Sequence, residues 1–341
     1  MPPSMSDRAA DIDGFLASAG WVGATRRPLA GDASFRRYDR VSRGGKVAVL
    51  MDAPPPKEDV RPFVAITRHL QTLGYSVPTV LAEDATLGLL LLEDLGDATY
   101  TKALASGTDE AALYTAAVDV IADLHAKPEA ITIPTGLPEY DAVRLLTEAE
   151  LLVDWYVPRR MGRPLDEASK GAFRDIWRAL APIMEGAGRA LVLRDFHADN
   201  LIWLPERGRL RNCVLLDYQD AVAGSPAYDL MSLIEDARRD MADGLETQLL
   251  ERYRAQRPGI DWPSFRAAYV TLAAQRHCKV IGIFTRLSVR DGKGHYLMHI
   301  PRCWRMLERA CQDPLLAPLR DWLDTHIPAA LRNTPLSELT G

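Results

Sequence analysis

The sequence is poor in cysteine and in long apolar runs, and each shortage excludes a class of protein. Its 341 residues include four cysteines, with no CxxC pair and no spacing typical of metal ligands: Cys213, Cys278, Cys303 and Cys311. This usage predicts reduced thiols in a cytoplasmic protein. No run approaches the roughly 18 apolar residues of a membrane span. Residues 1–14 lack a basic stretch followed by an apolar one, so we expect neither a signal peptide nor a membrane partner.

Positive charge is also not in excess. Lysine and arginine number 41 against 46 aspartates and glutamates, a net charge of −5. Such a balance argues against a nucleic-acid partner. A content of 47% hydrophobic and 26% charged residues is typical of a globular chain long enough for two lobes. No internal repeat is present, and no feature indicates an oligomeric state.

Strand-like segments dominate the first ninety residues. A helical pattern over 57–73, ending at Gly74, interrupts them, and the three prolines at 54–56 stop the strand before it. Together the segments predict a five-stranded antiparallel sheet. The predicted strands lie at residues 23–31, 34–42, 46–52, 77–84 and 87–94.

Beyond Gly96 the pattern is mainly helical. Three short apolar runs, at 190–193, 200–204 and 213–216, are too short for helices and suit small strands. We therefore predict an α+β chain with a β-rich lobe over 1–96 and a helical lobe over 97–341. The predicted helices are 109–126, 140–157, 166–185, 228–254, 263–282 and 299–311.

Three polar residues stand at the ends of those short runs. Asp195 follows the first run, Asn200 comes five positions later, and Asp217 ends the third run. Carboxylate and amide oxygens suit Mg²⁺, and a carboxylate free of metal could deprotonate a hydroxyl. Any one of the three alone is more typical of a turn, because Asp and Asn bond nearby backbone groups. Their spacing, however, is that of phosphotransferases of the protein-kinase type.

The motifs "LRDFHADN" and "LLDYQDAVAGSPAYDL" resemble the catalytic loop and the metal-binding segment of the aminoglycoside and choline phosphotransferases. The resemblance covers roughly residues 25–320 and implies a two-lobed protein-kinase-like fold that uses ATP and Mg²⁺. It implies Asp195 as catalytic base, Asn200 and Asp217 as metal ligands, and Asp229 as a structural residue that holds the catalytic loop. His197 is interpreted as a loop-positioning residue first and as a phosphate contact second. Where the family usually has His-Gly before the catalytic aspartate, this chain has Leu193-Arg194.

Further segments resemble a subgroup of that family, the bacterial anomeric kinases of N-acetylmuramate and N-acetylglucosamine. They include "GDASFRRY", "VLMDAPPPKED", "LLLLEDLGDATY" and "IGIFTRLSVRDGK". This resemblance implies a sugar kinase that phosphorylates the C1 hydroxyl in cell-wall recycling. Its partner would be a small-molecule sugar.

The nucleotide would contact two segments. The turn Asp32, Ala33 and Ser34 would place backbone amides over the phosphates, although any hairpin needs a turn of small residues. Glu93, Asp94 and Leu95 would form the connector whose backbone bonds adenine.

For the acceptor sugar, the sequence offers stacking rings and carboxylate-binding arginines. The alternative for each arginine is an ordinary solvated charge on a helix. The candidates are Trp155, Tyr156, Arg159, Arg160, Arg276 and Arg286.

The chain departs from the kinase pattern at the lysine of the third strand and the glutamate of the next helix. Those positions hold Met51 and Phe63. Losing both partners leaves no lone buried charge, but other cations must then neutralise the phosphates. Candidates are Lys46, Lys57, Arg36 and Arg37.

Two alternatives remain open. One is a kinase for an aminoglycoside or an amino alcohol such as choline, and the other is a kinase-fold binding protein without catalysis. The chain carries arginines rather than the acidic acceptor lining expected for cationic substrates, and the acids needed for catalysis are present.

Overall fold

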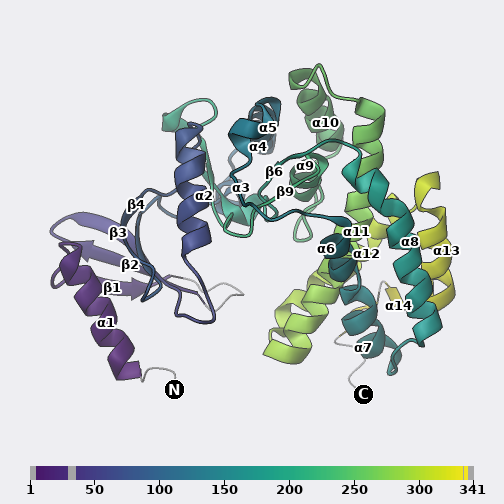
Figure 1. The fold of residues 1–341 in the computed structure, drawn as a ribbon, viewed down its shortest axis with the longest axis horizontal. Helices are drawn as coiled ribbons and strands as arrows, with labels where there is room; N and C mark the ends of the chain where they lie inside the picture. The colour runs from purple at the N-terminus through teal and green to yellow at the C-terminus, as the bar shows by residue number, and fades with distance from the viewer. Residues whose placement is uncertain (1–4, 30–35, 333, 337–341) are drawn as a thin grey trace. The chain divides into compact units, whose positions relative to one another are not determined.

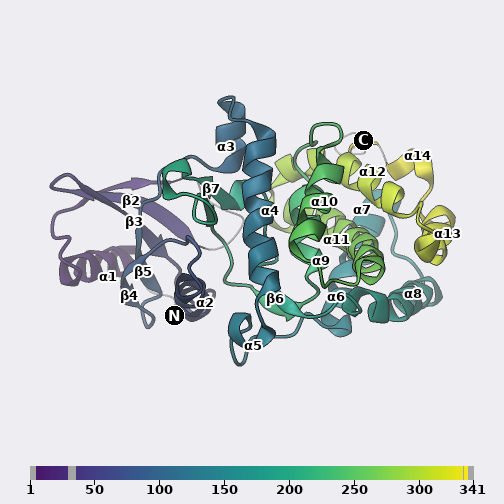
Figure 2. The same cartoon turned by 90° about the horizontal axis from the view of Figure 1, so that it is seen from above.

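The computed structural model describes residues 5–29, 36–332 and 334–336. They group into two compact units (Figures 1 and 2). Unit 1 comprises Met1–Ala117 and Ala198–Asp220, and unit 2 comprises Val118–His197 and Ala221–Gly341. Residues 198–220 therefore pack with the N-terminal part of the chain, although they follow it by eighty residues.

Unit 1 is built on the predicted five-stranded antiparallel sheet, which is confirmed. The strand order is β1-β2-β3-β5-β4, and every neighbouring pair is antiparallel. The third strand has the predicted bounds, because it is framed by a glycine turn and the proline run. The strands are β1 Thr25–Pro28, β2 Arg37–Arg43, β3 Lys46–Asp52, β4 Val80–Asp84 and β5 Leu89–Glu93.

One face of this sheet packs against α1 (Met5–Ser18), a helix that the sequence analysis did not predict (Figure 1). Ile12 and Phe15 of α1 join Leu50 and Leu91 in one apolar cluster. The alternation of side chains along each strand leaves the opposite face free for other contacts.

The helix predicted over 57–73 is α2, Arg61–Thr72. The prediction of its start was wrong, since the residues after the prolines form a turn and Val60 is the N-cap. Unit 1 also contains α3 (Tyr100–Ala105), the start of α4 (Glu110–Ala126) and a short hairpin of β7 (Leu201–Trp203) and β8 (Cys213–Leu215).

Unit 2 is helical around the long α11, Trp262–Asp291, which packs against α6, α8, α9 and α12. A two-stranded sheet pairs β6 (Ala190–Val192) with β9 (Val222–Gly224). The other helices are α5 Glu129–Thr132, α6 Ala142–Ala149, α7 Val157–Met161, α8 Glu167–Glu185, α9 Ala227–Ile234, α10 Leu245–Gln256, α12 Ile300–Ala310, α13 Ala317–His326 and α14 Ala329–Arg332.

Two predicted helices are not continuous. The segment 228–254 was wrongly predicted as one helix, since α9 ends at Ile234 and α10 begins at Leu245. The segment 140–157 contains a π-helical turn, Leu152–Tyr156, between α6 and α7. π-helical turns are frequent at functional sites.

Within the described ranges, no helix combines the length and the apolar character that a bilayer crossing requires.

Candidate functional site

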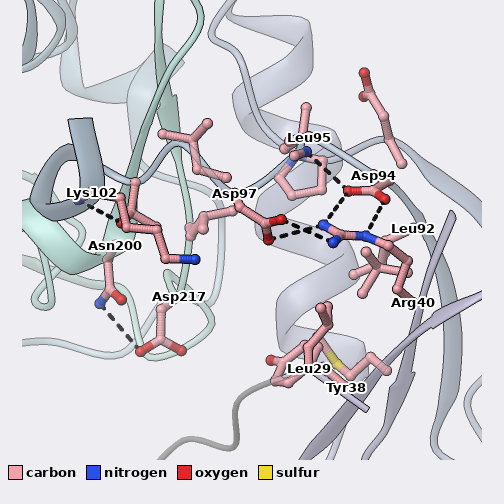
Figure 3. A pocket seen from close by; sticks show the side chains of 18 of the residues that line it. Leu29, Tyr38, Arg40, Leu92, Asp94, Leu95, Asp97, Lys102, Asn200 and Asp217 are labelled. Atoms are coloured by element: carbon pink, nitrogen blue, oxygen red, sulfur yellow. Dashed lines mark hydrogen bonds and ion pairs between the residues drawn. The ribbon is translucent and has the colours of Figure 1, made fainter. Parts of the chain in front are cut away.

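Unit 1 contains a cavity of about 330 Å³ on the sheet face opposite α1 (Figure 3). Apolar side chains such as Val49, Leu92 and Ile202 line it, together with polar groups of the connector and the hairpin. A mostly apolar cavity with a few polar groups suits the flat base of a nucleotide.

The connector residues Glu93, Asp94 and Leu95 all line this cavity. The Glu93 carboxylate accepts hydrogen bonds from Arg207 Nη2 at 2.6 Å and from Thr79 Oγ1 at 2.8 Å. Burial alone would raise the pKa of Glu93, but these bonds lower it below its ordinary value. The carboxylate is thus held by the protein, which leaves the backbone and the apolar walls for a ligand.

Arg40, which the sequence analysis did not single out, binds the connector to the sheet. Its guanidinium donates to Asp94 at 2.6 Å and to Asp97 at 3.0 Å, as Figure 3 shows. Hydrogen bonds to the two carboxylates raise the pKa of Arg40 further above its ordinary range. Only the strand register could have revealed this contact, because Arg40 lies 54 residues from Asp94 in the chain.

The hairpin brings Asn200 and Asp217 together at the cavity. Leu201 pairs with Leu215, and the Leu216 amide donates to the Asn200 carbonyl at 3.0 Å. The two side chains therefore face each other, with Asn200 Nδ2 at 3.4 Å from Asp217 Oδ2 (Figure 3).

Asp217 has a left-handed backbone, with φ of 55°. Such a conformation costs a non-glycine residue about 1–3 kcal/mol and is concentrated at functional sites. Its Oδ1 accepts hydrogen bonds from Arg36 Nη2 at 3.1 Å and Gln219 Nε2 at 2.9 Å. One carboxylate and one amide oxygen fit Mg²⁺, which binds few protein ligands and completes its shell with water and phosphate.

Met51 and Phe63 both line the cavity, where the kinase pattern has its ion pair. Met51 is only 1% exposed, and Phe63 stacks on Tyr218 with ring centroids 5.2 Å apart. Two apolar side chains thus stand where the kinase pattern has charged ones, so neither position buries an unpaired charge.

The four cations proposed as substitutes are not among the residues that line the cavity. Lys46, Lys57 and Arg37 are exposed. Arg36 is different, because its side chain is only 9% exposed and lies between Asp217 and Glu58, at 3.9 Å from the latter. Asp32, Ala33 and Ser34 lie outside the described residues.

Asp195 belongs to unit 2 and follows β6. The loop before it is held by Asp229, whose carboxylate accepts the amides of Leu193 at 2.7 Å and Arg194 at 3.0 Å. Burial raises the pKa of Asp229 to about 7, although both amides lower it.

Arg194 occupies the position where the resembled motif has glycine, and its φ is 67°. Its carbonyl accepts a hydrogen bond from Arg276 Nη1 at 3.3 Å, and its guanidinium pairs with Glu148. The guanidinium also lies 5.4 Å from the centre of the Tyr140 ring. Contacts on both main chain and side chain therefore hold this strained residue.

The surroundings of Asp195 favour its ionised form. Burial alone would raise the pKa of Asp195, but the charges of Lys279 and Arg276 outweigh it and lower that pKa below its ordinary value. An ionised carboxylate can accept a proton. His197, two residues on, is buried, and burial lowers its pKa, which favours a neutral imidazole in the loop.

The six acceptor candidates divide by burial. Tyr156 is 0% exposed and packs on Trp304, so neither face of its ring is open to a sugar. Arg160 donates to the Tyr156 hydroxyl, and Arg276 donates to the Tyr228 hydroxyl. Both guanidinium groups are thus bound by buried side chains of the protein. Half-exposed side chains remain at Trp155, Arg159 and Arg286.

Comparison with known proteins identifies a family that matches this chain and relatives that are similar to it. The phosphotransferase enzyme family matches residues 25–268. An N-acetylmuramate/N-acetylglucosamine kinase of Caulobacter vibrioides is 38% identical over 96% of this chain and 99% of its own length. A kinase with the same name from Pseudomonas aeruginosa is also 38% identical, over 87% of each chain.

Solved structures share the fold. Choline kinase LicA from Streptococcus pneumoniae superposes with a TM-score of 0.64 at 15% identity, covering 90% of this chain and all of its own. The gentamicin-APH(2")-IIa complex gives a TM-score of 0.58 at 16% identity, covering 90% of this chain and 97% of that one. The predicted kinase-like fold is confirmed.

Proposed function

The chain belongs to the phosphotransferase enzyme family, and we propose that it is an ATP-dependent kinase of N-acetylmuramate, N-acetylglucosamine or both. The observation that carries the proposal is that four relatives with this name are 35–38% identical over most of the chain. A kinase of this class would recover cell-wall sugars in the cytoplasm, where its nucleotide is available.

The proposed acceptor is the anomeric C1 hydroxyl. Its oxygen would attack the γ-phosphorus, the bond from that phosphorus to the β-phosphate oxygen would break, and ADP would leave. Asp195 is proposed as the base that takes the hydroxyl proton, and its lowered pKa supports this role. Asp229 is proposed as the residue that keeps the loop in place, supported by its two backbone hydrogen bonds.

Asn200 and Asp217 are proposed to hold Mg²⁺, supported by their place side by side at the cavity, where Asn200 Nδ2 lies 3.4 Å from Asp217 Oδ2 and each side chain carries an oxygen. The metal would supply charge neutralisation to the phosphates. For adenine we propose the connector Glu93, Asp94 and Leu95, with Asp32–Ser34 over the phosphates. The proposed lobes remain 1–96 and 97–341.

For the sugar we retain Trp155, Arg159 and Arg286, since their side chains are half exposed. Trp155 lies in the π-helical turn, which presents an aromatic ring suited to a sugar face. Tyr156, Arg160 and Arg276 are reassigned to supporting this region, because their environments are buried.

The test is release of ADP from ATP and Mg²⁺ by the purified chain with a panel of acceptors. N-acetylmuramate or N-acetylglucosamine should give turnover, whereas choline and kanamycin should not. Asp195→Asn should lower turnover by about 10²–10⁴-fold and keep ATP binding. Asp175→Asn, an exposed carboxylate change in the same unit, is the matched control and should have no effect. Turnover confined to choline or kanamycin would refute the sugar assignment.

A further inference from the structure

The cavity of unit 1 lacks the lysine expected to bind nucleotide phosphates, because Met51 and Phe63 replace the ion pair. A bound ATP carries several negative charges, and Coulomb attraction in a partly desolvated cavity is a main source of its affinity. Some other cation of this chain must therefore face the phosphates.

Among the described residues that line the cavity, four are acids, and each already pairs with an arginine. Asp94 and Asp97 bind Arg40, Glu93 binds Arg207, and Asp217 binds Arg36. Arg40, at the cavity wall, is therefore paired with two carboxylates. Their negative charges offset its own, so it offers little net positive charge to a ligand.

Lys102 is the remaining cation among the described residues that line the cavity. Figure 3 shows its side chain extending into the cavity, with Asn200 and Asp217 on one side and Asp97 on the other. Within the described part of the chain, no carboxylate lies at ion-pair distance from its ammonium group. Its field adds to the hydrogen bonds of Arg40 in lowering the pKa of Asp97.

The backbone at Lys102 is fixed relative to Asn200. Thr99 caps α3 by accepting the Lys102 amide at 3.3 Å, and its neighbour Ala98 accepts the Trp203 amide at 2.9 Å. Thr101 Oγ1 donates to Asp199, the residue before Asn200, at 2.5 Å. These two hydrogen bonds, one from the residues before α3 and one from α3 itself, hold the backbone of Lys102 beside the proposed metal ligands.

We propose that Lys102 binds the nucleotide phosphates and so takes the role of the lysine that kinases carry on the third strand. The proposal rests on the proposed function and names a binding residue for its phosphate donor. Lysine suits this role as a compact point charge on a flexible stem, which can follow the phosphates to the proposed metal ligands.

The test is calorimetric titration of the full chain, with Mg²⁺, by ATP, ADP and adenosine. Lys102→Met should weaken ATP and ADP binding by about tenfold, the loss expected for one partly solvated charge-assisted hydrogen bond. Adenosine, which has no phosphate, should bind the variant as it binds the wild type. Lys102→Arg keeps the charge and should restore most of the ATP affinity.

The matched control is Lys46→Met, which removes an exposed lysine of the same unit that is not at the cavity. It should leave all three affinities unchanged. Thermal melting of each variant establishes that the fold is intact, and little change is expected at an exposed side chain.

Equal loss of ATP and adenosine affinity in Lys102→Met would overturn the proposal, because it would mean a change of cavity shape. Unchanged ATP affinity would overturn it as well, while leaving the proposed kinase activity untouched. A wild type that binds no ATP would overturn both, and the wild-type titration reveals this first.

Discussion

At the scale of single residues, the most unusual feature is Arg194, directly before the proposed base. A left-handed φ of 67° is strained for any residue with a Cβ. The strain is sustained because Asp229 accepts the Arg194 amide and Arg276 donates to the Arg194 carbonyl. An arginine therefore stands where a glycine would adopt the same φ without strain, and its side chain forms an ion pair with Glu148.

Comparing Arg194→Gly with Arg194→Ala separates the strain from the side chain. Both variants lose the ion pair with Glu148, but only alanine keeps the penalty of a left-handed Cβ. We expect the alanine variant to be less stable than the glycine variant by about 1 kcal/mol in the free energy of unfolding, measured in urea. An alanine variant of equal or greater stability would contradict the strained backbone.

Lys279 offers a test through pH. Its charge lowers the pKa of Asp195, so the carboxylate stays ionised, and able to accept a proton, down to a lower pH. Lys279→Met should raise that pKa, and the acid limb of the kcat/KM profile should move to higher pH. Lys46→Met should not move the limb. An unmoved limb in Lys279→Met would show that Asp195 is not the group that titrates.

At the scale of elements, α11 organises unit 2 through a close approach at Gly282. A Cβ built there would lie 2.3 Å from the carbonyl carbon of Leu151, an atom of the backbone that cannot move aside alone. The glycine thus lets α11 contact the chain directly before the π-helical turn that carries Trp155.

Gly282→Ala should therefore lower the free energy of unfolding by about 2–4 kcal/mol, measured in urea. The matched control is Gly171→Ala in α8, where a Cβ meets nothing within 4 Å. That change should stabilise the chain by up to about 1 kcal/mol, because alanine is the better helix former. If both substitutions had the same effect, the close helix contact would be refuted.

Periodicity located most elements, since strands and amphipathic helices leave a repeating pattern in one segment. It failed between α9 and α10, where both local and long-range contacts interrupt an apolar pattern. Asp236 accepts the Arg238 amide at 2.9 Å, Gly244 adopts a left-handed φ of 78°, and Glu235 binds His277 of α11. The last contact spans 42 residues, which no local window can reveal.

At the scale of the whole molecule, the motifs predicted the fold because the spacing of Asp195, Asn200 and Asp217 is tied to one topology. The sequence also pointed to the connector and the hairpin that line the cavity. It did not reveal Arg40 or Lys102, whose places depend on strand register and on hydrogen bonds between α3 and the hairpin. The proposed acceptor residues were the least predictable from the sequence, because Tyr156 is buried whereas its neighbour Trp155 is half exposed.

The central claim is that the chain transfers phosphate to the anomeric hydroxyl of an N-acetylated amino sugar. Phosphorus NMR of the product formed from ATP and N-acetylglucosamine or N-acetylmuramate tests it most directly. A C1 phosphate should give a phosphorus signal split by the single anomeric proton. A signal split by the two C6 protons, or no phosphorylated sugar at all, would contradict the account.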